Sequence, residues 1–349
     1  MIVTLAAPWL AQFDTNWFAR DSGLPATPCL DRWLRFARVE AAPATLSPWT
    51  SSLSLFGLEA ADGGNIPWAP LSALGDGVDA GEASWVRIDP VHLRPDMARL
   101  RLFAVPDFGV TADEAEALAA IVREVLADWG ELHLGSSERW YLKLEEPHAV
   151  TTTPLHQAVT VELEAALPRG ESGPLWRVRL TEIQMRLFDS PVNRQREAQG
   201  AVAINGVWMW GMGKLPALPV SRYAAVFSES PVVRGAAIRS GVGRVAGLEE
   251  AHSWNGLTGT SAGEGLIWLE PGNPRSCGEP GEWGGYLQRI ETQWAMPLME
   301  RLATGDIEVL HLLPGDGTRR SVRRADLRRF WRHRSPWHHA VEARLRSVS

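Results

Sequence analysis

Apolar positions recur every three or four residues in three segments of this chain, which predicts amphipathic helices at residues 111–129, 176–188 and 285–302. Thr111, three residues before a glutamate, begins the first segment with the pattern of a capping box, which would satisfy two free backbone N–H groups at the helix start. The third segment contains Pro297, so we expect a kink in that helix. Further helices are expected at residues 28–37, 155–166 and 231–240.

Short apolar runs between these helices predict strands. They are expected at residues 2–7, 85–88, 100–104, 140–144, 205–210, 223–227, 265–269 and 308–313. Strands that alternate with helices predict an α/β fold with a mostly parallel sheet flanked by helices. Residues 84–150 instead run strand, strand, helix, strand, which predicts a small α+β subdomain inserted in the chain.

The composition places the chain among ordinary globular proteins. It has 349 residues, is 45% hydrophobic and 22% charged, and holds no apolar run long enough for a transmembrane helix. The first residues have no basic region or cleavage site typical of a signal peptide. Cys29 and Cys277 are too few for a disulfide framework and fit a reducing compartment. We therefore expect a cytoplasmic protein with no membrane partner.

The net charge of −6 argues against general nucleic-acid binding, but arginine is concentrated after residue 318. The arginines there are Arg319, Arg320, Arg323, Arg324, Arg328, Arg329, Arg332, Arg334, Arg344 and Arg346. Such a run can bind phosphates or an acidic partner, or it can be a solvated helix face in a protein that uses arginine almost everywhere.

The segment 190–216 is rich in glycine and carries two asparagines. Glycine allows a ligand to approach the backbone closely, so the N–H groups of this segment could cradle a small anion. Arginines here and in the segment 89–96 are suited to bidentate hydrogen bonding with phosphate or carboxylate. The candidate ligand-binding residues are Arg94, Asn193, Arg196, Asn205, Gly211 and Gly213. Alternatively, these side chains only fix a demanding loop and brace the seam between domains.

Four segments in chain order are TPCLD at 27–31, SPWTSSLSLFG at 47–57, the segment 190–216 and GDGT at 315–318. Together they resemble the cofactor-independent phosphoglycerate mutases of the archaeal type, members of the alkaline-phosphatase superfamily. DPVHLRPD at 89–96 and ERWYLKL at 138–144 further resemble a bacterial group labelled regulatory protein RpfE. The resemblance implies an alkaline-phosphatase-like core at residues 1–83 and 151–349, with the inserted α+β subdomain at 84–150.

The family reaction moves a phosphoryl group through a phosphoserine, and the resemblance implies two divalent metals such as Mn or Mg, held by Asp and His. This chain departs from that pattern at several positions. The first strand has no Asp, Pro48 aligns with the nucleophile, residues 270–281 contain no His, Gly317 replaces a ligating His, and Trp210 replaces an Arg. Asp316 is retained from the family GDH motif.

Three functions are therefore open. The first is a non-catalytic, mutase-like protein with a regulatory or binding role, no expected metal cofactor, and a phosphorylated small molecule or a protein as its partner. The second is an active phosphomutase or phosphohydrolase, acting on 2- or 3-phosphoglycerate with divalent metals in a rebuilt site. The third is an interaction module that acts through the arginine-rich C-terminus.

Overall fold

The structure is a computed structural model that describes residues 1–11, 24–42, 49–58, 66–96, 99–252, 263–270 and 280–328. The chain divides into two compact units. Unit 1 combines Met1–Glu59 with Leu218–Ser349, and unit 2 is Ala60–Ala217. Unit 2 is therefore inserted between the two parts of unit 1.

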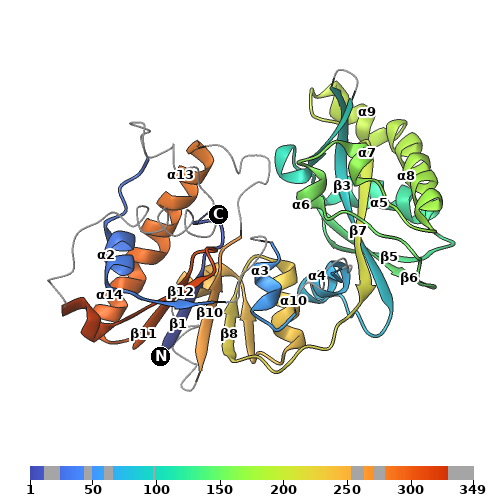
Figure 1. The fold of residues 1–349 in the computed structure, drawn as a ribbon. Helices are drawn as coiled ribbons and strands as arrows, with labels where there is room; N and C mark the ends of the chain where they lie inside the picture. Colours follow the sequence, from blue (N-terminus) through green and yellow to red (C-terminus); the bar gives the residue numbers. More distant parts are fainter. Residues whose placement is uncertain are drawn as a thin grey trace. The chain divides into compact units, whose positions relative to one another are not determined.

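Seven described strands form the sheet of unit 1, in the order β2-β12-β11-β1-β10-β8-β9 (Figure 1). Their bounds are β1 (Ile2–Ala6), β2 (Arg38–Ala41), β8 (Tyr223–Phe227), β9 (Arg244–Ala246), β10 (Glu264–Trp268), β11 (Val309–Leu313) and β12 (Thr318–Arg323). The central β1 pairs in parallel with β10 and β11, and β12 runs antiparallel to its neighbours. The prediction of an α/β fold with a mostly parallel sheet flanked by helices is confirmed.

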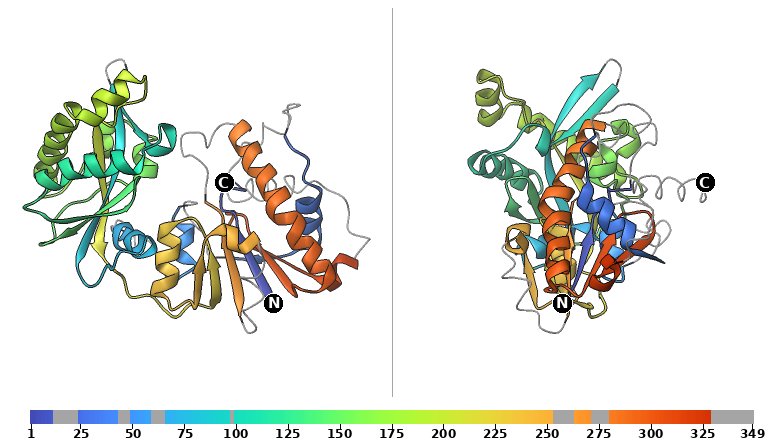
Figure 2. Two further views of the ribbon diagram at one scale, coloured as in Figure 1. Left: turned by 180° about the vertical axis from the view of Figure 1, so that it is seen from behind. Right: turned by 90° about the vertical axis from the view of Figure 1, so that its left-hand side faces the viewer.

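One face of this sheet is packed against helices α2 (Pro28–Phe36), α13 (Pro280–Arg289) and α14 (Met296–Thr304), as Figures 1 and 2 show. Leu5 of β1 and Leu312 of β11 are fully buried there. The remaining described α-helices of unit 1 are α3 (Ser51–Ser54), α10 (Pro231–Arg239) and α11 (Leu248–His252). Because side chains alternate along a strand, Thr4 and His311 face the other side of the sheet.

A π-helical turn, Ile290–Ala295, joins α13 to α14. Pro297 is the second residue after this turn, and its missing N–H and bulky ring prevent a regular helix from continuing through the turn. The kink expected at Pro297 is thus a change from α-helix to π-helix and back. The turn also presents Glu291, whose buried carboxylate accepts hydrogen bonds from the N–H groups of Cys29 (2.7 Å) and Leu30 (2.9 Å). Glu291 therefore caps α2 from a distant part of the chain.

Unit 2 is built on an antiparallel sheet in the order β4-β3-β6-β5, with β7 paired to the other edge of β3. The bounds are β3 (Ser84–Asp96), β4 (Arg99–Ala104), β5 (Gly130–Ser136), β6 (Arg139–Leu144) and β7 (Gly206–Lys214). Helices α5 (Ala112–Val125) and α8 (Gly173–Phe188) contribute to the core on one face. Helix α4 (Trp68–Gly75) packs on β3 and β7.

The inserted unit is longer than the 84–150 expected from the sequence. Its extra length has a physical reason: β7 pairs with β3 over most of its length, and α4 and α8 pack on the same sheet. The segments on both sides of 84–150 therefore belong to the same compact unit.

In unit 2, α5 and α8 follow the sequence pattern, whereas α4 and a helix at 191–198 were not among the helices expected. The capping box at Thr111 and Glu114 is confirmed, with each side chain bonded to the backbone N–H of the other residue. The single helix expected at 155–166 is wrong, since two short helices, α6 (Leu155–Ala158) and α7 (Leu163–Ala166), occur instead. Thr160 ends the first by donating its hydroxyl to the carbonyl of Gln157. Among the described residues, no helix combines the length and apolarity needed to span a membrane.

We predict that Gly315→Ala strongly destabilises unit 1. Gly315 has φ +90°, and an added Cβ would lie 2.1 Å from the carbonyl oxygen of Pro8. Gly241→Ala is the matched control, because its φ is +75° but nothing lies within 4 Å of the added atom. Urea unfolding should show a loss of about 1 kcal/mol for the control and about 2 kcal/mol more for Gly315→Ala. Equal losses would mean that contact with Pro8 does not constrain the turn.

Candidate functional site

A cavity of about 370 Å³ lies in unit 1 at the carboxyl ends of β1, β10 and β11, beside α3. Ligands of open α/β sheets generally bind at this edge. The walls are mostly apolar and include Phe56, Val220, Trp268 and Leu313. The polar residues of the lining are Ser51, Ser54, Ser221, Arg222, Thr318 and Arg319.

The turn after β11 contains Asp316, the residue retained from the GDH motif. Its Oδ1 accepts hydrogen bonds from the N–H (3.0 Å) and hydroxyl of Thr318, and its Oδ2 accepts one from Arg320 Nη2 (2.7 Å). The Asp316 and Arg320 side chains are only 1% and 5% exposed. Asp316 therefore closes an Asx turn and forms a buried ion pair.

The described residues do not fit a two-metal cage. Hard divalent cations need several carboxylate and imidazole ligands that converge. Within the described ranges, no group of three or more His, Cys, Asp or Glu could hold a metal ion. Arg320 neutralises the carboxylate of Asp316, and Gly317 supplies no imidazole. Glu279, His338 and the neighbouring His339 lie outside the described residues.

The serines near the expected nucleophile position hold local structure. Ser47 and Pro48 lie outside the described residues. Ser52 donates its hydroxyl to the carbonyl of Trp49 (2.9 Å), and Ser54 donates to the carbonyl of Ser51 (2.9 Å). These two hydroxyls stabilise the turn of α3.

The first arginines of the basic run are used within the chain. Arg319 binds Glu40 through Nη2 (2.6 Å) and Nε (3.1 Å), while Arg320 pairs with Asp316. The arginines from Arg329 onward lie outside the described residues. The structure thus gives internal partners to two members of this run.

The predicted ligand-binding residues Asn193 and Arg196 lie on α9 (Pro191–Ala198) and are buried. The Asn193 amide donates to the carbonyls of Leu187 (2.8 Å) and Ile204 (2.9 Å), and it accepts from the N–H of Ile204 (2.8 Å). Arg196 pairs with Glu114 at 2.8 Å and donates to three backbone carbonyls. Both side chains join α9 to neighbouring loops, and their ligand-binding role stays a prediction.

Asn205 lies at the end of the loop that joins α9 to β7, and Arg94 lies close to that loop. Asn205 accepts from the N–H of Leu93 (2.7 Å) and donates to its carbonyl (2.8 Å), as a neighbouring strand would. Arg94 is exposed, and its guanidinium lies 4.6 Å from the ring centroid of Phe103. The structure therefore brings Asn193, Arg196 and Asn205 around one loop, with Arg94 beside it.

Gly211 and Gly213 lie at the other end of β7, against the start of α4. An added Cβ would lie 2.7 Å from Trp68 at Gly211 and 2.7 Å from Pro67 at Gly213. Gly211 also has φ +68°, which favours glycine. The two glycines thus allow close approach by a helix of the same chain. Asp316 is in unit 1, so it does not share a unit with these residues.

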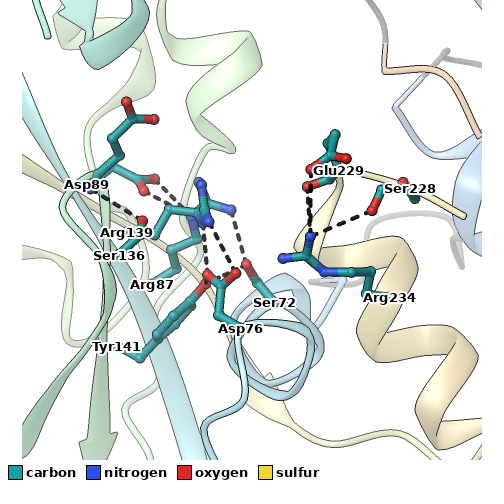
Figure 3. A network of polar contacts seen from close by, with 11 residues as sticks. Ser72, Asp76, Arg87, Asp89, Ser136, Arg139, Tyr141, Ser228, Glu229 and Arg234 are labelled. Carbon is teal, nitrogen blue, oxygen red and sulfur yellow. Dashed lines mark hydrogen bonds and ion pairs between the residues drawn. The ribbon is translucent and has the colours of Figure 1, made fainter. Parts of the chain in front are cut away.

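A polar network that the sequence analysis did not identify joins α4 to the sheet of unit 2 (Figure 3). Arg139 binds Asp76 through Nε (2.7 Å) and Nη2 (3.0 Å), and the Tyr141 hydroxyl donates to the same carboxylate (2.7 Å). Arg87 continues the network to Asp89 at 2.9 Å. The spacing of Arg139 and Tyr141, two apart on a strand, was the available signal that both face one side.

Trp210, which stands where the family has an arginine, belongs to this network. Its indole N–H donates to the carboxylate of Asp89, and the Arg87 guanidinium lies 4.9 Å from its ring centroid. His156 packs edge-on against the same ring. Burial, and secondly the Arg87 charge, lower the pKa of His156 to about 4. Burial beside this network, more than the Arg87 charge, therefore keeps the imidazole neutral.

We predict that Asp316→Asn costs about 3 kcal/mol of unfolding free energy, because it leaves the buried Arg320 without a counter-charge. Asp306→Asn is the control: its carboxylate is 58% exposed and lies 3.8 Å from Arg301. That change should cost less than about 1 kcal/mol in the same urea experiment. An unchanged midpoint for Asp316→Asn would contradict the buried pair.

We also predict that stability falls as the pH drops from about 6.5 toward 4. In that window the unfolded chain protonates His156 while the folded chain does not, so protons favour unfolding. Urea unfolding across the window should show a smaller fall for His156→Phe than for the unchanged protein. Parallel curves for the two proteins would show that His156 does not titrate in this way.

Comparison with known proteins places the chain beside one family. The 2,3-bisphosphoglycerate-independent phosphoglycerate mutase of Methanothrix thermoacetophila is 28% identical over 156 residues, which are 43% of this chain and 38% of that protein. A protein of Geobacter sulfurreducens named a probable mutase of the same kind is 28% identical over 298 residues, 76% of this chain and 71% of that protein. The match thus spans well under two thirds of the first relative. No protein-family model matches the chain.

One solved structure supports the fold. The PH0037 protein of Pyrococcus horikoshii has a TM-score of 0.56 at 15% identity, with 92% of this chain and 85% of that chain covered. The cofactor-independent phosphoglycerate mutase of Thermoplasma acidophilum has a TM-score of 0.45 at 17% identity and covers 92% of this chain. The sequence relatives are named phosphoglycerate mutases, and this chain is phosphoglycerate-mutase-like.

Proposed function

We propose that this chain is a phosphoglycerate-mutase-like protein that acts by binding, without two-metal phosphoryl transfer. The observation that carries the proposal is the buried pair between Asp316 and Arg320. A metal ligand must direct a charged oxygen to the cation, but both carboxylate oxygens of Asp316 are engaged by Thr318 and Arg320. A divalent cation there would also have to sit beside a guanidinium.

Sequence positions outside this pair support the same proposal. The strand β1 carries no carboxylate, and position 317 is a glycine with φ +71° where a histidine would supply a ligand. Pro48 has no hydroxyl to attack a phosphoryl group. Each change removes a different part of the chemistry, so restoring one residue would not restore transfer.

A regulatory role in the cytoplasm, as in the bacterial RpfE group that the sequence resembles, completes the proposal. Its partner would be an anionic small molecule or a protein. Arg94 is the exposed member of the predicted ligand-binding set, whereas the donors of Arg196 are engaged within unit 2. A phosphorylated ligand at these positions stays a proposal.

We predict that the purified protein takes up no stoichiometric Mn²⁺ and does not interconvert 2- and 3-phosphoglycerate. Isothermal titration with Mn²⁺ measures the first property. A coupled assay, run with and without added metal, measures the second. The Methanothrix mutase serves as the positive control under the same conditions.

Saturable binding of two Mn²⁺ per chain, or turnover above the background without enzyme, would overturn the proposal. Turnover would instead favour an active mutase with a rebuilt site. Asp316→Asn would then abolish activity while Asp306→Asn, in an exposed pair, would not.

A further inference from the structure

The cavity of unit 1 has a charge pattern opposite to that of a metal site. Among the described residues that line it, none is acidic, and the two charged ones are Arg222 and Arg319. The described lining offers a divalent cation no carboxylate oxygen, whereas its guanidinium N–H groups can donate to an anion. The available donor groups therefore favour an anionic ligand.

Each of the two arginines keeps one donor group available. Arg319 directs Nε and Nη2 to Glu40, and Arg222 directs Nη2 to the hydroxyl of Tyr223 (2.7 Å) and Nε to Glu264 (3.4 Å). Nη1 of each guanidinium has no partner within the described part of the chain. A guanidinium has five N–H donors, so each arginine can bind an anion without giving up its present partner.

Trp268 adds an unused neutral donor. Trp268 is part of the cavity lining and is 2% exposed, and its buried indole nitrogen has no hydrogen-bond partner among the described residues. A buried N–H without an acceptor costs free energy, which a ligand oxygen would recover.

The remaining lining residues indicate the polarity of the rest of the ligand. Phe56, Val220 and Leu313 present apolar surface, and a volume of about 370 Å³ is typical of small-molecule pockets. Phosphoglycerate carries a phosphate and a carboxylate on a three-carbon body, so burying it here would desolvate more negative charge than two arginines already paired with Glu264 and Glu40 can match. An apolar body with one charged end fits these walls better.

We propose that this cavity binds a small organic monocarboxylate with an apolar body. Its carboxylate would contact Arg222 and Arg319, and a ligand oxygen would accept the indole N–H of Trp268. The inference rests on the proposed function, because it assigns a ligand class to a site that performs no metal-assisted transfer.

The test uses the full chain and three probes, measured by isothermal titration. Octanoate should bind saturably, octanamide about tenfold more weakly because it has the same body without the charge, and 3-phosphoglycerate without saturation. Equal affinity for octanoate and octanamide, or tighter binding of 3-phosphoglycerate, would overturn the proposal.

Variants separate the two kinds of contact. Arg319→Gln should weaken octanoate about tenfold and leave octanamide unchanged, whereas Trp268→Phe should weaken both about fivefold. Arg244→Gln is the matched control, since Arg244 is also partly exposed and paired, with Glu250 at 2.7 Å, but does not line the cavity. If Trp268→Phe fails to fold, the comparison between Arg319→Gln and Arg244→Gln still decides.

The two proposals fail in different ways. A protein that binds neither Mn²⁺ nor octanoate overturns only the ligand assignment. A protein that binds Mn²⁺ stoichiometrically overturns the proposed function, whatever the octanoate titration gives.

Discussion

The buried ion pair between Asp316 and Arg320 is the constraint on which the candidate site depends. It fixes the turn between β11 and β12, and that turn contacts Pro8 directly after the central strand. A buried pair of charges is expensive to desolvate and stabilises only when its hydrogen bonds are complete. Here Thr318 completes them, which leaves the carboxylate saturated. The carboxyl edge of the sheet is thus organised by the charges of the chain itself.

Local patterns predicted the elements whose stability is local. The capping box at Thr111 needs only residues three apart, so the sequence identified it correctly. Strand β3 was predicted as 85–88 but runs to Asp96. Its continuation contains Pro90, and a proline usually argues against a central strand. β7 pairs with β3 past Pro90, with Val207 opposite, but on the other edge pairing with β6 ends at Ile88 and pairing with β4 begins at Val91, so Pro90 is tolerated there. The proline falls between two partner strands, a fact that only the sheet pairing reveals.

The candidate site was less predictable, since its contacts join distant segments. The turn role of Asp316 could be expected from its neighbours, but its pairing with Arg320 depends on how β12 leaves the turn. Likewise, the glycines at 211 and 213 indicated that another part of the chain packs closely on β7, but not which part. The structure shows that it is the start of α4, more than 130 residues earlier in the chain. The network around Asp76 was missed for the same reason, because Asp76 lies 63 and 65 residues before its partners Arg139 and Tyr141 on β6.

Glu291 has a consequence for how the protein meets anions from solution. The first turn of a helix attracts negative charge, because its N–H groups lack partners inside the helix. At α2 the π-helical turn supplies that charge as a side chain, so the start of the helix carries a resident counter-ion. The same carboxylate, after burial, raises the pKa of the Cys29 thiol. A thiol held in its protonated form is a poor nucleophile. This helix start should therefore neither bind dissolved phosphate well nor react readily with electrophiles.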